Sequence, residues 1–224
     1  MPKLESSRSS KSVEDYLKAI WLNARDGPAS TGTIATSLGI SDASVTGMLG
    51  KLNGLGVVSY RRYHGAQLTP SGEQQALQLL RCHRLIETFL IEYLGYRWDE
   101  VHSEAEALEH AVSDRFTERL AFRLGHPSHD PNGDPIPKAD GTLPDTPNTP
   151  LAEVDIGDTL RVSRLLTQAK DILAYLADLG IWPGQGVKVH QREPLGGLLH
   201  ITVQKEKTVI SKELATLVRG KVRT

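Results

Sequence analysis

Two neighbouring stretches of the sequence are rich in side chains that bind divalent metal ions. These side chains are His83, Glu87, His102, Glu106, Glu109 and His110. Both stretches lack Gly and Pro and contain few β-branched residues, so we expect helices. Residues three or four positions apart share a helix face, so this spacing brings carboxylates and imidazoles together. The set predicts a divalent-metal site, and an ordinary solvated helix face is the alternative.

The composition bounds the class of protein. The chain has 224 residues, 39% of them hydrophobic, and no apolar run long enough to cross a bilayer. The N-terminus lacks the apolar core of a signal peptide, and a single cysteine, Cys82, excludes an intramolecular disulfide. We therefore expect a cytoplasmic protein without a membrane partner.

Charge is unevenly distributed along the chain. Residues 1–75 carry eight Lys/Arg against six Asp/Glu, whereas residues 76–126 carry six against nine. A basic first part and an acidic middle favour a nucleic-acid reader joined to a cation-binding module.

The first part has the pattern of a helix-turn-helix domain. Three helices are expected, over about 12–25, 31–38 and 42–53. Gly39 ends the second helix and Ser41 caps the third, because Gly is favoured just after helices and Ser just before them. In a helix-turn-helix domain the second helix of the motif enters the DNA major groove N-terminus first.

A basic β-hairpin is expected next. Residues 57–60 and 66–69 alternate like strands around a segment that contains Arg61 and Arg62. Two arginines near a hairpin tip suit contacts to phosphates, which predicts a wing. The residues expected to contact DNA are Ser41, Ala43, Ser44, Thr46, Lys51, Arg61 and Arg62.

A long helix opens the middle of the chain. Thr69 is its expected N-cap, Pro70 its first residue and Leu94 its approximate end. Apolar residues cover more than one face of this helix, which favours a helical dimerisation module. Two more helices are expected, over about 102–112 and 114–124. A dimer would present two recognition helices to two DNA half-sites.

The last third of the chain changes character. Seven of the twelve prolines lie in residues 126–150, which predicts an irregular or mobile connector. Beyond it, four short strand patterns and one helix predict a small β-barrel-like domain. The strands are expected near 158–162, 186–190, 198–203 and 208–210, and the helix near 168–179.

These motifs follow one another in the order found in a known family. The chain resembles the iron- and manganese-dependent transcriptional regulators of the diphtheria-toxin-repressor family along nearly its whole length. Besides the helix-turn-helix and wing, the matching stretches are 12–17, 68–72, 83–87, 101–106, 109–114 and 132–137. The resemblance implies a metal-loaded homodimer that binds a double-stranded DNA operator and represses metal uptake.

The resemblance also implies the fold class and its boundaries. We expect a mainly α protein with small β parts and an SH3-like β-barrel as its last domain. The expected parts are a winged helix-turn-helix domain at 1–75, a helical metal-binding and dimerisation domain at 76–126, a Pro-rich linker at 127–151 and the SH3-like domain at 152–224.

Two metal positions are implied by the resemblance. The primary site would use Asp15, Glu106, Glu109 and His110, and the ancillary site would use His83, Glu87 and His102. Two simpler interpretations stay open. Asp15 would cap the first helix together with Ser12, and His83 with Glu87 would form an ordinary surface pair.

The residue types at the primary site favour manganese. Iron-type members of the family have Cys where this chain has Glu106 and Met where it has Asp15. Oxygen and nitrogen ligands accommodate Mn²⁺, whereas sulfur favours softer metals, so we expect Mn²⁺ with Fe²⁺ as the alternative. Lys18 argues against a closely spaced two-metal centre, because manganese-type members have an acidic residue there.

The third domain departs from the longer relatives. In those proteins it completes the ancillary site with a Glu and a Gln, and this chain has Arg164 and Thr167 at those positions, with Gln168 adjacent. A guanidinium cannot bind a cation and a Thr hydroxyl is a weak ligand. We therefore expect an ancillary site made by His83, Glu87 and His102 alone.

Two other classes of function stay open from the sequence. A metalloenzyme would use the same His and Glu residues, but it would need an open coordination position, and no nucleophile motif or phosphate-binding Gly loop is present. A metal-independent winged-helix regulator is the other alternative. DNA binding that is unchanged by a chelator would identify it.

Overall fold

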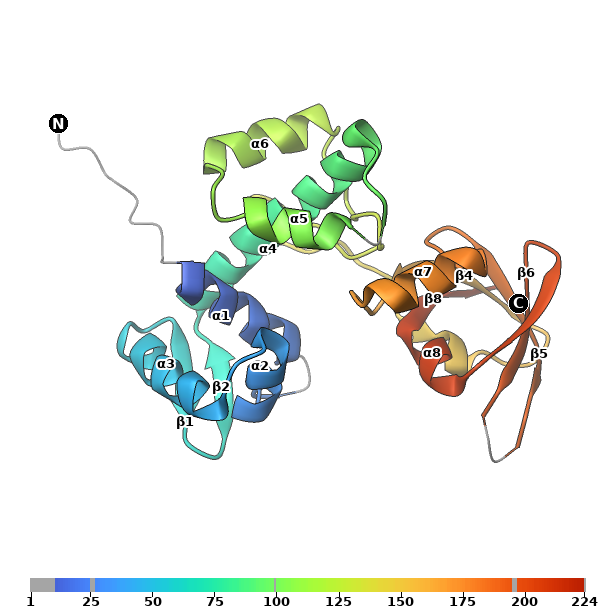
Figure 1. The fold of residues 1–224 in the computed structure, drawn as a ribbon, viewed down its shortest axis with the longest axis horizontal. Coiled ribbons are helices and arrows are strands. Elements are labelled where there is room, and N and C mark those ends of the chain that lie inside the picture. Colours follow the sequence, from blue (N-terminus) through green and yellow to red (C-terminus); the bar gives the residue numbers. More distant parts are fainter. Residues whose placement is uncertain (1–10, 25–26, 99, 195–196, 224) are drawn as a thin grey trace. The chain divides into compact units, whose positions relative to one another are not determined.

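The computed structural model describes residues 11–24, 27–98, 100–194 and 197–223. These residues form two compact units, and Figure 1 labels their helices and strands. The first unit reaches to Cys82 and includes Ala139–Gly141, and the second holds the rest. The boundary falls inside one long helix, α4 (Pro70–Leu94). Among the described residues, no helix combines the length and hydropathy needed to span a membrane.

The first unit is a helix-turn-helix followed by a β-hairpin. Its elements are α1 (Lys11–Asn23), α2 (Thr31–Leu38), α3 (Asp42–Gly54), β1 (Val58–Arg61) and β2 (Gly65–Leu68). The expected ends of α2 and start of α3 are confirmed. Gly39 adopts φ 65°, a left-handed conformation that Gly tolerates, and the Ser41 hydroxyl accepts a hydrogen bond from the Ser44 N–H.

Apolar side chains at helical spacing hold this unit together. Leu17 and Ile20 of α1, Ile34 of α2, and Leu49 and Leu52 of α3 are fully buried in one cluster. Burying each such side chain stabilises the fold by about 1.5–3 kcal/mol. The helix α1 already includes Lys11, the first described residue, so Ser12, the expected cap residue, lies inside the helix.

Two short helices follow α4 in the second unit. They are α5 (Val101–Leu108) and α6 (Asp114–Arg123), and Ser113 caps the start of α6. The expectation of one helix through residue 112 is wrong, because α5 ends at Leu108 and a turn follows. Asp99, whose residue type and position in the sequence suggest the N-cap of α5, lies outside the described residues.

The Pro-rich connector has little regular secondary structure, as expected, but part of it is buried. Residues 132–137 are all buried. The Leu165 N–H donates to the Asn132 carbonyl, at 2.9 Å. A Cβ on Gly133, which has φ 82°, would lie 1.9 Å from the Ser163 carbonyl oxygen. Only glycine lets this turn lie so close to the neighbouring strand.

The C-terminal part is a six-stranded antiparallel sheet with two helices. Its elements are β3 (Thr149–Pro150), a 3₁₀ turn (Leu151–Glu153), β4 (Thr159–Leu165), α7 (Lys170–Asp178), β5 (Gly186–Arg192), β6 (Leu199–Val203), β7 (Glu206–Ile210), α8 (Lys212–Leu217) and β8 (Val218–Arg223). The strand order is β3-β8-β4-β5-β6-β7. Alternate residues point inward, so Leu160, Val187 and Ile201 are fully or almost fully buried. The sequence pattern did not predict β3, α8 or β8.

Candidate metal centre

Three side chains of the kinds that can bind a metal ion converge on one point in the second unit. His83 and Glu87 lie one turn apart on α4 and are almost completely buried, and His102 reaches them from α5. Glu87 Oε1 is 3.0 Å from His83 Nε2 and 3.0 Å from His102 Nδ1. The two ring nitrogens are 3.1 Å apart. The predicted ancillary set is therefore brought together, and these three residues are called the His83 triad below.

The charges of the triad are strongly coupled. Burial alone would raise the pKa of Glu87, but the charges and hydrogen bonds of His83 and His102 outweigh it and hold that pKa well below its ordinary value. Burial opposes protonation of His102, yet its hydrogen bonds to Glu106 and Glu87 and their charges raise its pKa to about 9. The carboxylates thus make this point favourable for a positive charge.

The geometry of the triad fits a divalent cation. The second oxygen of Glu87, Oε2, is buried and has no hydrogen-bond partner among the described residues. Two atoms bonded to one cation at about 2.1 Å and at right angles lie about 3.0 Å apart. The separations among the three donor atoms, 3.0 to 3.1 Å, match this value. Two imidazoles and one carboxylate on one face of an octahedron are a known iron(II) arrangement, and octahedral geometry also suits manganese.

Glu109 connects the triad to the second predicted set. It follows the last residue of α5, and its side chain is buried. Its Oε2 is 2.5 Å from His83 Nδ1, and its Oε1 is 3.4 Å from His110 Nε2. The turn after α5 therefore places one carboxylate between two imidazoles. Glu109 and His110 are adjacent members of the predicted primary set.

The other two members of that set lie on different elements. Glu106 is on α5 with a half-exposed side chain, and its Oε1 is 3.4 Å from His102 Nε2. Asp15 is on α1 in the first unit and is half-buried. It lines a hollow of about 780 Å³ together with Ser44, Gly47 and Lys51 of α3. Asp15 thus lies beside the helix expected to read DNA.

A buried polar network borders the triad, and sequence reasoning missed it. Arg84, next to His83, donates from Nη1 to the Pro135 carbonyl at 2.5 Å. Its Nε is 3.7 Å from Asp130 Oδ2. Burial, and then the charges of Asp134 and Glu87, raise the pKa of Asp130. The acidic positions 130 and 134, on either side of Asn132-Gly133, were the available signal.

The third domain joins this network through Arg164, the residue that stands at a ligand position of the longer relatives but cannot bind a cation. Arg164 of β4 is buried and forms an ion pair with Asp134, which also lies 3.9 Å from Arg84. The Asn132 side chain donates to Gln168 Oε1 at 3.3 Å. The guanidinium charge of Arg164 is therefore offset by a carboxylate from the connector.

The residues predicted to contact DNA lie on the solvent-facing side of the first unit. Val45 and Leu49 bury one face of α3, which leaves the other face exposed. All seven predicted contact residues are exposed: Ser41, Ala43, Ser44, Thr46, Lys51, Arg61 and Arg62. The Arg62 guanidinium lies 5.1 Å from the centre of the Tyr63 ring.

Three family models match successive parts of the chain. Residues 9–66 match the iron dependent repressor N-terminal DNA binding domain, and residues 69–138 match its metal binding and dimerisation domain. Residues 149–222 match the FeoA domain. Together these matches place a DNA-binding domain, a metal-binding dimerisation domain and a β domain in this order.

Individual relatives agree with these matches. An uncharacterized HTH-type transcriptional regulator of Methanocaldococcus jannaschii, MJ0568, is 42% identical over 113 residues, which are 50% of this chain and 90% of that protein. The HTH-type transcriptional regulator MntR of Listeria innocua is 34% identical over 140 residues, 60% of this chain and 96% of that protein.

Solved structures resemble the whole fold. A manganese-dependent transcriptional repressor in complex with manganese has a TM-score of 0.87 at 38% identity and covers 93% of this chain and 100% of its own. The IdeR protein of T. acidophilum has a TM-score of 0.78 at 29% identity, with 94% and 97% covered. The chain therefore belongs to the diphtheria-toxin-repressor family of metal-dependent transcriptional regulators.

Proposed function

We propose that this regulator is activated by Mn²⁺, with Fe²⁺ as the alternative, and that as a homodimer it represses metal-uptake genes. The observation that carries the proposal is the buried His83 triad, in which one oxygen of Glu87 has no hydrogen-bond partner among the described residues. When bound, the cation supplies the positive charge that offsets repulsion among the carboxylates. The triad would form the ancillary site.

The donor atoms support manganese. Every side chain assigned to the two sites offers oxygen or nitrogen, and hard or borderline donors suit Mn²⁺. The single cysteine of the chain, Cys82, is buried and directly precedes His83 on α4. Neighbouring helix residues point about 100° apart, so Cys82 is directed away from the triad.

The primary site would join the DNA-binding domain to the helical domain. Glu106, Glu109 and His110 belong to the helical domain, and Asp15 belongs to α1 of the DNA-binding domain. Ligands drawn from both domains make ion binding favour one placement of the recognition helix α3, because a ligand stabilises the arrangement that it binds best. The repressor would thus bind its operator only when metal is bound.

Exposed apolar residues support the homodimer. Phe116 and Phe122 of α6 are 45% and 77% exposed, and Tyr93 and Leu94 at the end of α4 are also exposed. Large apolar side chains gathered at the surface are typical of protein interfaces. Two copies joined here would present two recognition helices to an operator with two half-sites.

Selection on random DNA duplexes tests the proposal. The full-length chain would be incubated with Mn²⁺, with Fe²⁺ under anaerobic conditions, or with chelator, and bound duplexes would be sequenced. We expect one two-fold-symmetric sequence in the metal samples and none with chelator. The same sequence enriched equally with chelator would identify a metal-independent regulator instead.

A further inference from the structure

The outward face of the C-terminal sheet carries basic side chains in excess. Residues 152–224 contain eleven Lys/Arg against eight Asp/Glu. Strand alternation directs Leu160 and Val187 into the core, so their neighbours Arg161 and Lys188 point outward. The exposed basic residues on this side are Arg161, Lys188, Lys207, Lys221 and Arg223. They are called the basic face below.

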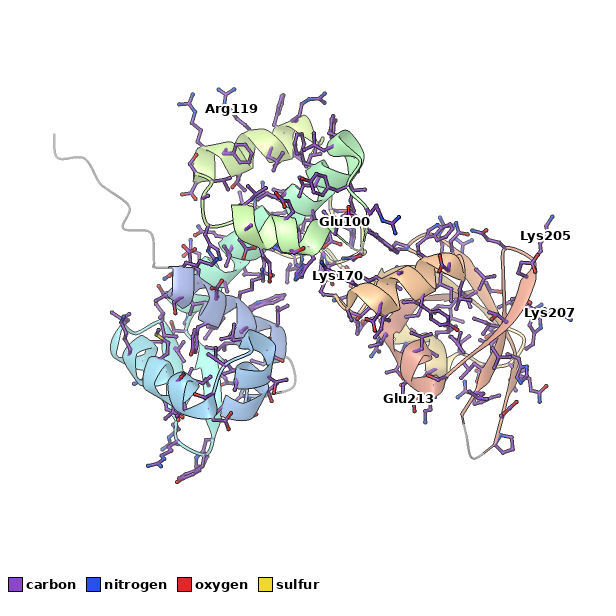
Figure 2. The ribbon with its side chains drawn as sticks, viewed as in Figure 1. Glu100, Arg119, Lys170, Lys205, Lys207 and Glu213 are labelled. Carbon is purple, nitrogen blue, oxygen red and sulfur yellow. The ribbon has the colours of Figure 1, made fainter. Side chains whose placement is uncertain are left out.

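These residues lie in two rows across the sheet. In the first row, successive backbone partners are Arg223, Thr159, Lys188, Thr202 and Lys207, one on each of β8, β4, β5, β6 and β7. Neighbouring strands are about 4.8 Å apart, so the backbones of successive basic residues are roughly 10 Å apart. Figure 2 shows Lys207 projecting away from the domain. Threonine hydroxyls between the cations add hydrogen-bonding groups that also bind phosphates.

The second row contains an unfavourable pair. Arg161 and Lys221 are direct partners on β4 and β8. Like charges placed directly opposite each other destabilise a sheet. Among the described residues, no carboxylate forms an ion pair with any member of the basic face; Glu193, at the edge of the sheet, is engaged by His200 at 2.9 Å. An external anion would relieve this repulsion.

We propose that the basic face binds the phosphate backbone of duplex DNA that flanks the operator. This rests on the proposed function, because the winged helix brings the whole chain to a polyanion. A weak cationic surface tethered to a bound domain acts at a high effective concentration. Lysine, arginine and threonine contacts to phosphate add affinity without reading sequence. The C-terminal domain therefore contributes salt-sensitive affinity to the loaded repressor.

The test compares charge-matched variants of the full-length chain. One variant carries Lys188→Gln with Lys207→Gln, and another carries Arg161→Gln with Lys221→Gln. The control, Lys170→Gln with Lys212→Gln, removes two exposed positive charges from helices of the same domain. Dissociation constants for an operator duplex with about 15 flanking base pairs on each side, roughly one and a half helical turns, would be measured from low to high salt with Mn²⁺.

Each lost phosphate contact flattens the plot of log affinity against log salt by about 0.9. We expect both basic-face variants to have a shallower slope by about 1 to 2 and several-fold weaker binding at low salt, with the control unchanged. The Arg161 and Lys221 variant should also unfold at a higher temperature, since a repulsive pair is gone. Slopes equal to that of the control would overturn the proposal.

Two further results would separate failure of the proposed function from failure of the basic-face proposal. If the native chain binds no duplex with Mn²⁺, the proposed function itself fails. In the other result, the salt dependence of operator binding is the same for the native chain and both variants, while phosphatidylserine vesicles bind only the native chain. The basic face would then recognise lipid phosphate, and the DNA proposal would be overturned.

Discussion

The imidazole of His83 lies between the carboxylates of Glu109 and Glu87. Its Nδ1 is 2.5 Å from Glu109 Oε2, and its Nε2 is 3.0 Å from Glu87 Oε1. Metal-binding histidines commonly donate their second ring nitrogen to a carboxylate, which fixes the tautomer and raises the basicity of the ligand. Glu109 fills this role for His83 while belonging to the predicted primary set. The two proposed sites therefore share a hydrogen bond.

The first prediction concerns Glu109. Replacing Glu109 by Gln keeps its size but removes the charge that faces His83 and His110. We expect the Mn²⁺ concentration for half-maximal DNA binding to rise by about 10- to 100-fold, as for other carboxylates that support a ligand. Glu104→Gln, at a half-buried position on α5, is the matched control and should behave like the native chain. Equal midpoints for the two variants would contradict the assignment.

A second prediction concerns metal preference. Glu106→Cys replaces a hard oxygen donor by a thiolate, which favours softer metals. Activation midpoints measured anaerobically under reducing conditions should shift the preference from Mn²⁺ toward Fe²⁺, Co²⁺ or Zn²⁺. An unchanged rank order of the metals would remove Glu106 from the proposed primary site.

The third prediction tests whether Arg164 stabilises the fold without taking part in metal binding. Arg164→Met breaks its buried pair with Asp134 and should destabilise the protein by about 3 kcal/mol in urea unfolding. Arg164 is not a ligand, so Mn²⁺ affinity at the His83 triad should change less than about threefold, a difference of under 1 kcal/mol. Arg161→Met, on the exposed side of the same strand, is the control and should lose no stability. A large loss of metal affinity without a loss of stability would show that the third domain acts on the site directly.

The fourth prediction concerns the turn of the connector at Gly133, which packs against β4. A methyl group on Gly133 would collide with the Ser163 carbonyl, and φ of 82° disfavours any other residue. Gly133→Ala should therefore destabilise the protein by at least about 1–3 kcal/mol. Gly50→Ala on α3, where a Cβ meets nothing within 4 Å, should instead stabilise it by about 0.5–1 kcal/mol. Urea unfolding that shows equal stability for the two variants would mean that the turn relaxes freely.

Local signals in the sequence predicted the first unit well. The α2 helix has the expected bounds, because Ser30 caps its start and Gly39 its end through contacts between near neighbours. The C-terminal end of α5 depends on a contact between residues far apart in the sequence, which the local pattern does not contain. Residues 109–112 are acceptable helix formers, yet the chain turns after Leu108, where the Glu109 carboxylate reaches His83 on α4. A contact between distant residues outweighed local propensity there.

The C-terminal part shows the same limit. β8 was not predicted, because Gly220 interrupts its strand pattern. The structure explains this glycine: a Cβ at position 220 would lie 2.1 Å from the Arg161 carbonyl oxygen. Proline content predicted an irregular connector, but its burial depends on Arg84 and Arg164, which are far away in sequence. Residue types and spacing paired His83 with Glu87, but only the resemblance to the family added His102 to them. The hydrogen bond between His83 and Glu109 could be found only from the structure.

The most direct test of the account is operator binding by the full-length chain as free Mn²⁺ is varied. We expect tight binding only with metal, complete loss with chelator, and a midpoint at least about tenfold higher for Glu87→Gln, which removes the charge at the centre of the triad. Unchanged thermal unfolding of the metal-free variant would show that its fold is intact. Equally tight operator binding by the native chain with Mn²⁺ and with chelator would contradict the claim that metal controls this repressor.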